Sequence, residues 1–253
     1  MGTLIAGNWK MNGLGPEGGG LDGLALADEL RARLAAGAPP RCELVVAPPA
    51  TLIARVAWKL KGSAIALSGQ DCHAEPSGAH TGDVSAEMLK EAGCRYVIVG
   101  HSERRREHGE RDELVRAKAA AAHRAGLIAI VCVGESAAER DGGKAESVVG
   151  RQLAGSLPAA ATAADTIIAY EPVWAIGSGR TPRAAEIAAL HAALRQALAA
   201  KWGEAAAARI LYGGSVTAAN AKEILGTRGV DGALIGGASL KADEFWAIAQ
   251  SCP

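Results

Sequence analysis

Short apolar runs recur along the whole chain, and they constrain its fold more than any other feature. They are rich in β-branched residues and lack polar alternation, which is typical of strands buried on both faces. Stretches rich in Ala, Leu, Glu and Arg separate them, and this repeated alternation predicts a closed (β/α)8 barrel, with an open doubly wound sheet as the alternative. The runs occupy residues 3–7, 43–48, 64–70, 95–100, 127–134, 166–170, 209–214 and 230–237.

The stretches between these runs have the residue spacing of amphipathic helices. In one of them, Ile187, Leu190, Leu194 and Leu198 recur at intervals of three or four residues and fall on one helical face. No linker-like change in composition interrupts the alternation. We therefore expect residues 1–253 to form a single α/β domain, a size that one such barrel commonly reaches.

Charge and cysteine content narrow the class of protein. The 27 Lys and Arg residues balance the 27 Asp and Glu residues, so the chain has no field that attracts nucleic acid or an anionic membrane. No signal peptide is visible, and no apolar run is long enough to cross a bilayer. The odd, scattered cysteines favour reduced thiols, so we predict a cytoplasmic protein. They are Cys42, Cys72, Cys94, Cys132 and Cys252.

The motifs give no support for a metal or a redox cofactor. None of the six histidines belongs to an H-E-x-x-H pattern, and the cysteines form no C-x-x-C pair. The segment "GLGPEG" at 13–18 has the glycine spacing of a dinucleotide site, but the next predicted strand ends without the acid that binds ribose. We therefore expect no cofactor and no metal.

In a barrel of this kind, functional groups gather at the carboxyl ends of the strands. Here those ends carry acids, a base, amides and glycines of complementary chemistry, and their convergence is a stronger signal than any single motif. The residues are Asn8, Lys10, Gln70, His101, Cys132, Glu135, Glu171, 213–215 and 236–237.

Glu171 ends the sixth run and precedes an unusual segment. Val173, Trp174 and Ile176 follow it, in a stretch too rich in Gly and Pro for a helix or a strand. A loop of this kind can cover the carboxylate and exclude water, and desolvation raises the basicity of a carboxylate. We predict that Glu171 is a general base, and a salt-bridged structural acid is the alternative.

His101 and Lys10 supply the matching electrophiles. His101 follows the fourth run and begins a stretch with helix-start character, where the helix dipole disfavours its protonated form and leaves a neutral ring as hydrogen-bond donor. Lys10 lies between Trp9 and Met11, so we expect its ammonium group to point into the mouth of the barrel. The alternatives are a structural histidine, a surface lysine and a Schiff-base lysine.

The last two predicted strands end in glycine-rich turns. Ser215 stands in "YGGS", and Gly236 and Gly237 end "LIGG". Glycines let backbone N–H groups approach an anion, and phosphate sites of barrels often follow these two strands. A phosphate site is the prediction, and a pair of tight turns is the alternative.

Together these segments resemble the triosephosphate isomerase family. The segments "AGNWKMN", "GHSERR", "YEPVWAIGSG", "YGGSV" and "DGALIGGASL" are similar to signatures of that family and occur in its order. With "GQDCHAEPSGAHTGD" they span nearly the whole chain. The resemblance implies a TIM barrel that interconverts dihydroxyacetone phosphate and D-glyceraldehyde 3-phosphate through an enediolate, in glycolysis and gluconeogenesis, without a cofactor.

The resemblance also implies a role for each matched position. Glu171 is the base, His101 the electrophile and Lys10 the electrostatic stabiliser, while residues 172–182 form a closing lid. Asn8, Lys10, Gly177, Ser215, Gly236 and Gly237 bind the substrate and its phosphate. The surroundings of these groups, which support Lys10, shield Glu171 or latch the lid, are Glu103, Cys132, Glu135, Trp174, Ile176, Tyr212, Ser215 and Leu234. Arg195 and Asp231 form a structural ion pair.

The same resemblance implies a homodimer in which the loop 70–83, carrying Thr81, reaches the partner's active-site region. Ser178 and Arg180 depart from the family's usual residues in the lid hinge, which concerns lid motion and not chemistry. Two alternative functions are a barrel aldolase that uses Lys10 as a Schiff base, and a non-catalytic scaffold that binds sugar phosphates.

Overall fold

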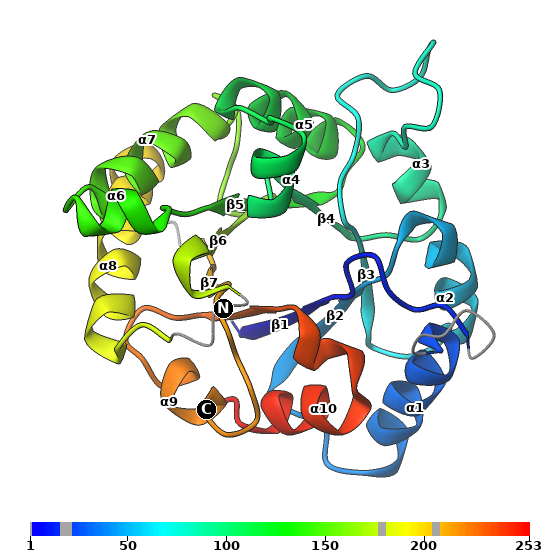
Figure 1. Ribbon diagram of the computed structural model, residues 1–253. Coiled ribbons are helices and arrows are strands. Elements are labelled where there is room, and N and C mark those ends of the chain that lie inside the picture. The colour runs from blue at the N-terminus through cyan, green and yellow to red at the C-terminus, as the bar shows by residue number, and fades with distance from the viewer. Residues whose placement is uncertain (1, 16–21, 177–180, 204–207) are drawn as a thin grey trace.

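The computed structural model describes residues 2–15, 22–176, 181–203 and 208–253. Within these residues the strands pair in parallel and in sequence order, and β8 pairs with β1 to close the barrel. Figure 1 shows the strands as a central ring that is surrounded by helices. The strands are β1 Thr3–Asn8, β2 Cys42–Ala47, β3 Ala66–Gly69, β4 Tyr96–Val99, β5 Ile128–Val133, β6 Thr166–Tyr170, β7 Ile210–Tyr212 and β8 Gly232–Ile235.

Each predicted apolar run overlaps one of these strands, and the predicted closed barrel is confirmed. α-Helices and single 3₁₀ turns connect the strands. The α-helices are α1 Gly23–Ala36, α2 Ile53–Lys59, α3 Ala86–Glu91, α4 Ser102–Glu107, α5 Asp112–Arg124, α6 Ala137–Asp141, α7 Ala145–Ser156, α8 Ala184–Trp202, α9 Ala221–Leu225 and α10 Ala242–Gln250, and the 3₁₀ turns are η2 Ala50–Leu52, η3 Val173–Ala175 and η4 Gly237–Leu240. No helix among the described residues is long and apolar enough to cross a membrane.

Two apolar clusters explain why the strands lack polar alternation. Alternate residues of each strand point to opposite faces. In β1, Leu4 and Ala6 belong to a cluster that fills the barrel, whereas Ile5 belongs to a larger cluster between the strands and the helices. Both faces are therefore apolar.

The helices pack on the outer cluster through the predicted apolar faces. In α8, Ile187, Leu190, Leu194 and Leu198 are all buried, as their spacing indicates. Polar side chains define several helix starts. Asp22, for example, accepts the N–H groups of the first turn of α1 and so satisfies donors that have no partner within the helix.

The segment after Glu171 differs from the prediction. Val173–Ala175 form a 3₁₀ turn, in which the Ala175 N–H donates to the Pro172 carbonyl oxygen at 2.8 Å. A turn of this length is compatible with proline before its first residue, because proline lacks only the N–H that such a turn leaves unused. The expectation of no helical structure here was therefore wrong.

A buried histidine on α8 makes the fold sensitive to acid. His191 is fully buried; its Nδ1–H donates to the Gly229 carbonyl oxygen at 3.0 Å, and its Nε2 has no partner among the described residues. Burial, which disfavours the charged ring, lowers the pKa of His191 to about 4. The unfolded chain therefore binds a proton at higher pH than the folded chain does, and stability is lost as the pH falls below about 6.5.

We expect the free energy of unfolding to fall by about 2 kcal/mol more in the wild type than in His191→Asn between pH 7.5 and pH 5. Asparagine retains a donor for Gly229 but has no proton to bind. Denaturant unfolding at fixed protein concentration measures this difference, and His108→Asn, at an exposed position, is the control. Equal pH dependence in all three proteins would contradict the assignment to His191.

Candidate active site

A cavity of about 340 Å³ opens at the carboxyl ends of the strands. Its walls come from residues that follow β1, β4, β6, β7 and β8, so parallel pairing brings distant segments of the sequence together. Most of the side chains predicted for substrate binding and catalysis meet here. Its lining includes Asn8, Lys10, His101, Glu171, Ile176, Ser215, Leu234, Gly236 and Gly237.

Glu171 lines this cavity, and its side chain is buried, with 2% of the residue exposed. Its backbone N–H donates to the Val133 carbonyl oxygen at 2.8 Å, so its position continues the β5–β6 ladder. Only glycine fits at position 134, because a Cβ atom there would lie 1.7 Å from the Glu171 carbonyl oxygen. The close approach of two strand ends thus determines where the carboxylate stands.

Three donors hold the Glu171 carboxylate. The Ser102 N–H donates to Oε2 at 2.9 Å, the Ser102 hydroxyl to Oε1 at 3.4 Å, and His101 Nε2 lies 2.9 Å from Oε1. Burial raises the pKa of Glu171, but His101 and the Ser102 N–H outweigh it, and the pKa lies below its ordinary value. The expectation that desolvation makes Glu171 more basic was therefore wrong for this arrangement, because burial also brings donors to the carboxylate.

His101 is the N-cap residue of α4, and this position determines its tautomer. Its Nδ1 accepts the backbone N–H of Glu103 at 3.3 Å, which leaves Nε2 as the protonated nitrogen of a neutral ring, facing Glu171. Burial lowers the pKa of His101, but the ionised Glu171 raises it more. The start of α4 thus favours the neutral ring, whereas the Glu171 carboxylate favours the protonated ring while the two side chains are in contact.

Lys10 is held in a strained backbone conformation at the mouth of the cavity. Its φ angle is +52°, in the left-handed region that non-glycine residues seldom adopt. Its N–H donates to Asn8 Oδ1 at 3.0 Å, and Gln70 Nε2 donates to its carbonyl oxygen at 2.8 Å. Its Nζ lies 2.5 Å from Glu103 Oε1 and beside Gly236, so the ammonium group faces the cavity as predicted.

The glycine pair after β8 exposes backbone to the same cavity. A Cβ atom on Gly237 would meet no atom within 4 Å, and one on Gly236 would contact the Lys10 side chain. Ser215 also lines the cavity, while its hydroxyl donates to the Ala175 carbonyl oxygen at 3.2 Å. Gly177, Ser178 and Arg180 lie outside the described residues.

Glu135 connects the segment after Glu171 to the barrel. Although fully buried, its carboxylate accepts hydrogen bonds from Trp174 Nε1 at 2.9 Å and Tyr170 OH at 3.1 Å, and lies 3.2 Å from Arg140. The guanidinium of Arg140 also stacks 4.6 Å from the Trp174 ring. The Tyr212 hydroxyl, predicted to latch the lid, has no hydrogen-bond partner among the described residues.

Cys132 and Arg195 have structural surroundings. Cys132 is buried inside the barrel, where burial and the neighbouring Glu171 raise the pKa of its thiol well above the ordinary value. It therefore packs beside the carboxylate as an unreactive thiol. Arg195 forms the expected ion pair with Asp231.

Sequence reasoning overlooked Ser102, although this residue controls the position of Glu171. Its position directly after His101, in the first turn of α4, was the available signal, because first-turn N–H groups have no partner within a helix. The sequence did not indicate that a carboxylate from β6 accepts one of them.

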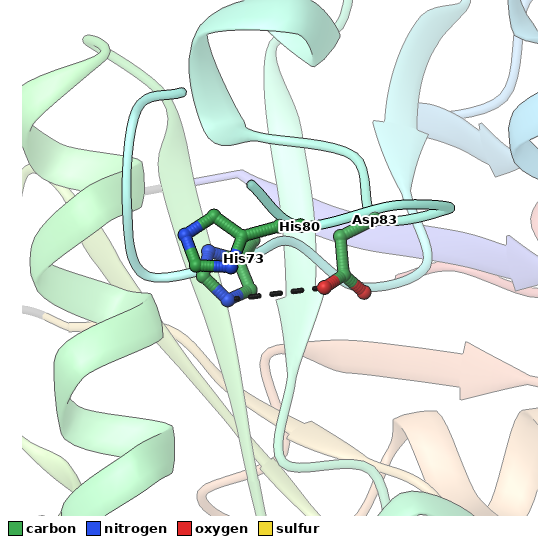
Figure 2. Close-up of side chains that lie close together, drawn as sticks. All are labelled: His73, His80 and Asp83. Carbon is green, nitrogen blue, oxygen red and sulfur yellow. Dashed lines mark ion pairs between the residues drawn. The ribbon is translucent and has the colours of Figure 1, made fainter. Parts of the chain in front are cut away.

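One group of metal-ligating side chains lies outside the cavity. Figure 2 shows His73, His80 and Asp83 together, with ring centroids 3.9 Å apart and His73 Nε2 3.8 Å from Asp83. No sequence motif indicated this cluster. His73 Nδ1 accepts the Glu75 N–H at 3.0 Å, which leaves the proton on Nε2, the nitrogen that faces Asp83. A protonated Nε2 cannot bind an ion, and we assign no metal role to these side chains.

Comparisons with known proteins agree with this geometry. The family model described as triosephosphate isomerase matches residues 3–252. Curated triosephosphate isomerases from Afipia carboxidovorans and Rhodopseudomonas palustris are 58% and 57% identical, over 99% of this chain and 97% and 98% of theirs. The crystal structure of triosephosphate isomerase from Bartonella henselae superposes with a TM-score of 0.89 at 47% identity, covering 99% of both chains. The chain therefore belongs to the triosephosphate isomerase family.

Proposed function

We propose that this protein interconverts dihydroxyacetone phosphate and D-glyceraldehyde 3-phosphate, a step of glycolysis and gluconeogenesis. The observation that carries the proposal is one cavity that combines a carboxylate, an imidazole, an ammonium group and exposed glycine backbone. Family membership over residues 3–252 supports the same reaction. Glu171, His101 and Lys10 are the proposed catalytic residues, and the backbone at 236–237 is the proposed phosphate site.

The reaction moves a proton between two neighbouring carbons. The Glu171 carboxylate removes the proton from the carbon next to the carbonyl, which leaves an enediolate, and then returns it to the other carbon. Negative charge develops on the substrate oxygen. His101 Nε2–H and the Lys10 ammonium group face the cavity and can stabilise that charge in a pocket partly shielded from water.

Glu171 has to leave its present position before it can act. In this structure the Ser102 N–H and His101 Nε2 contact its two carboxylate oxygens. Movement of the carboxylate towards substrate breaks these contacts and removes two influences that lower its pKa, so its basicity rises where the proton is taken. Ile176 and Leu234 line the cavity with Glu171 and are suited to exclude water there.

The contacts of Lys10 argue against the aldolase alternative. A Schiff base requires an amine nucleophile, whereas Lys10 Nζ lies 2.5 Å from Glu103 in the contact of an ammonium group with a carboxylate. Borohydride trapping with substrate separates the two reactions, because only the aldolase forms an adduct on Lys10. A non-catalytic scaffold would not need Glu171, His101 and Lys10 together in one cavity, so their presence there argues against this alternative.

We further propose that the chain acts as one domain, that it resides in the cytoplasm and that it forms a homodimer through the loop 70–83. This loop projects away from the barrel in Figure 1, and Thr81 within it is exposed. Met11, which is 95% exposed, lines a second hollow together with Asp71 and His73 of this loop, and a partner chain that packs there would cover its apolar side chain.

Replacement of Glu171 by glutamine tests the base. We expect Glu171→Gln to fold normally and to lose roughly 10²–10⁴-fold in kcat, because the amide cannot accept the substrate proton. A coupled isomerase assay in both directions measures this, with circular dichroism as the check on folding. Glu113→Gln, an exposed carboxylate on α5, is the matched control. Near-wild-type turnover in Glu171→Gln would remove this residue from the role.

Replacement of Gly237 by alanine tests the phosphate site. The added Cβ enters open space, so the fold is retained while the approach of a phosphate oxygen to the backbone is hindered. We expect at least about tenfold weaker binding of inorganic phosphate, the cost of one charged hydrogen bond. Calorimetric titration measures it. Gly150→Ala on α7, where a Cβ also meets nothing within 4 Å, should leave binding unchanged.

Light scattering tests the proposed dimer. At micromolar concentration we expect twice the mass of one chain for the wild type and one chain mass for Met11→Glu, because a carboxylate at a buried apolar interface is costly. Trp58→Glu, at an exposed apolar position on α2, is the control and should remain dimeric. A wild-type protein with the mass of one chain would contradict the proposal.

A further inference from the structure

Two cysteines that are far apart in the sequence meet at the end of the barrel opposite the cavity. Cys42 begins β2, and Cys252 follows the last turn of α10. The Cys42 thiol donates to the Ala249 carbonyl oxygen at 3.8 Å, and the Cys252 backbone N–H donates to the same oxygen at 3.3 Å. The shared acceptor places the two cysteines side by side.

Neighbouring contacts keep this segment in place. Gln250 Nε2 donates to the Ala38 carbonyl oxygen at 3.1 Å, which ties the end of α10 to the chain just before β2. The Ser251 hydroxyl donates to the Ala247 carbonyl oxygen at 2.9 Å. The contact between the two cysteines is therefore part of an ordered junction.

The chemistry of this pair differs from that of the other thiols. Cys72, Cys94 and Cys132 are buried, and burial raises the pKa of each thiol, to about 12 for the first two. By contrast, Cys42 and Cys252 stand beside each other: the interaction between them lowers the pKa of the Cys252 thiol and raises that of Cys42, and Cys42 is partly exposed. The thiolate is the reactive form of cysteine. Among the five cysteines, this pair is therefore the one best suited to thiol–disulfide exchange.

We propose that Cys42 and Cys252 form a reversible intrachain disulfide when the protein meets an oxidised low-molecular-weight disulfide such as oxidised glutathione. The Cys252 thiolate attacks one sulfur of the small disulfide, forms a mixed disulfide and expels one thiolate. Cys42 then loses its proton, attacks the Cys252 sulfur and expels the second thiolate. Two protein thiols are oxidised, and one small disulfide is reduced to two thiols.

The bond has a defined consequence for the fold. It joins the first residue of β2 to the segment after α10 and closes most of the chain, residues 42–252, into one loop, so it restricts the unfolded state strongly. It forms at the amino-terminal end of the strands, whereas Glu171 and His101 lie at the carboxyl-terminal end. Oxidation therefore stabilises the protein without altering turnover.

Peptide mapping of the full chain tests the proposal. After incubation with oxidised glutathione and tryptic digestion without reductant, we expect peptides 42–55 and 242–253 to be joined, with a mass two hydrogens below their sum. The melting temperature should rise by about 5 °C or more and return on addition of dithiothreitol, with unchanged turnover.

The variants distinguish this bond from other oxidation. Cys42→Ser and Cys252→Ser should each abolish the joined peptides and the melting shift, whereas Cys94→Ser, at a buried thiol outside the pair, should retain both. Mixed glutathione adducts alone, joined peptides from other cysteines, links between chains, or thiols at 42 and 252 that remain open to iodoacetamide would each overturn the proposal. The wild-type mapping decides the matter even if a serine variant fails to fold.

Discussion

The pairing of β8 with β1 is the contact on which the rest of the structure depends. Leu4 and Gly232 are direct partners, and the φ angle of Gly232 is +146°. A Cβ atom there would lie 1.9 Å from the Leu4 carbonyl oxygen, so any other residue would separate the strands. Because the barrel is closed, Lys10 after β1 and Gly236 after β8 lie side by side, although they stand near opposite ends of the chain. The cavity exists only in the closed sheet.

The features that the sequence predicted well are those set by burial and by parallel pairing. Strands covered on both faces must be apolar throughout, so the runs around Ile5, Ile98 and Ile168 are visible without an alignment. Parallel strands also place all their carboxyl ends at one rim, and reading those ends identified the side chains that line the cavity, such as His101 and Glu171.

The features that the sequence did not predict depend on contacts between the rim residues. The position of a side chain at a strand end does not specify its rotamer. The hydrogen bond from the Ser102 N–H to Glu171 was therefore not predicted, and neither was the lowering of the Glu171 pKa. The contact between the His73 and His80 rings depends likewise on the path of an irregular loop. Periodicity carries no information about such contacts, because they arise after the chain has folded.

The contact between Glu171 and His101 gives the resting site a different acid–base balance from the one that proton transfer requires. It makes the carboxylate less basic and the imidazole easier to protonate, since each charge favours the other. Once Glu171 moves away, burial, Lys10 and the first turn of α4 disfavour the charged form of His101, and Glu103 still favours it but does not touch Nε2. Displacement of one carboxylate therefore produces the stronger base and the neutral donor together. The resting contact keeps both groups hydrogen-bonded in a buried site, where an unpaired carboxylate is costly.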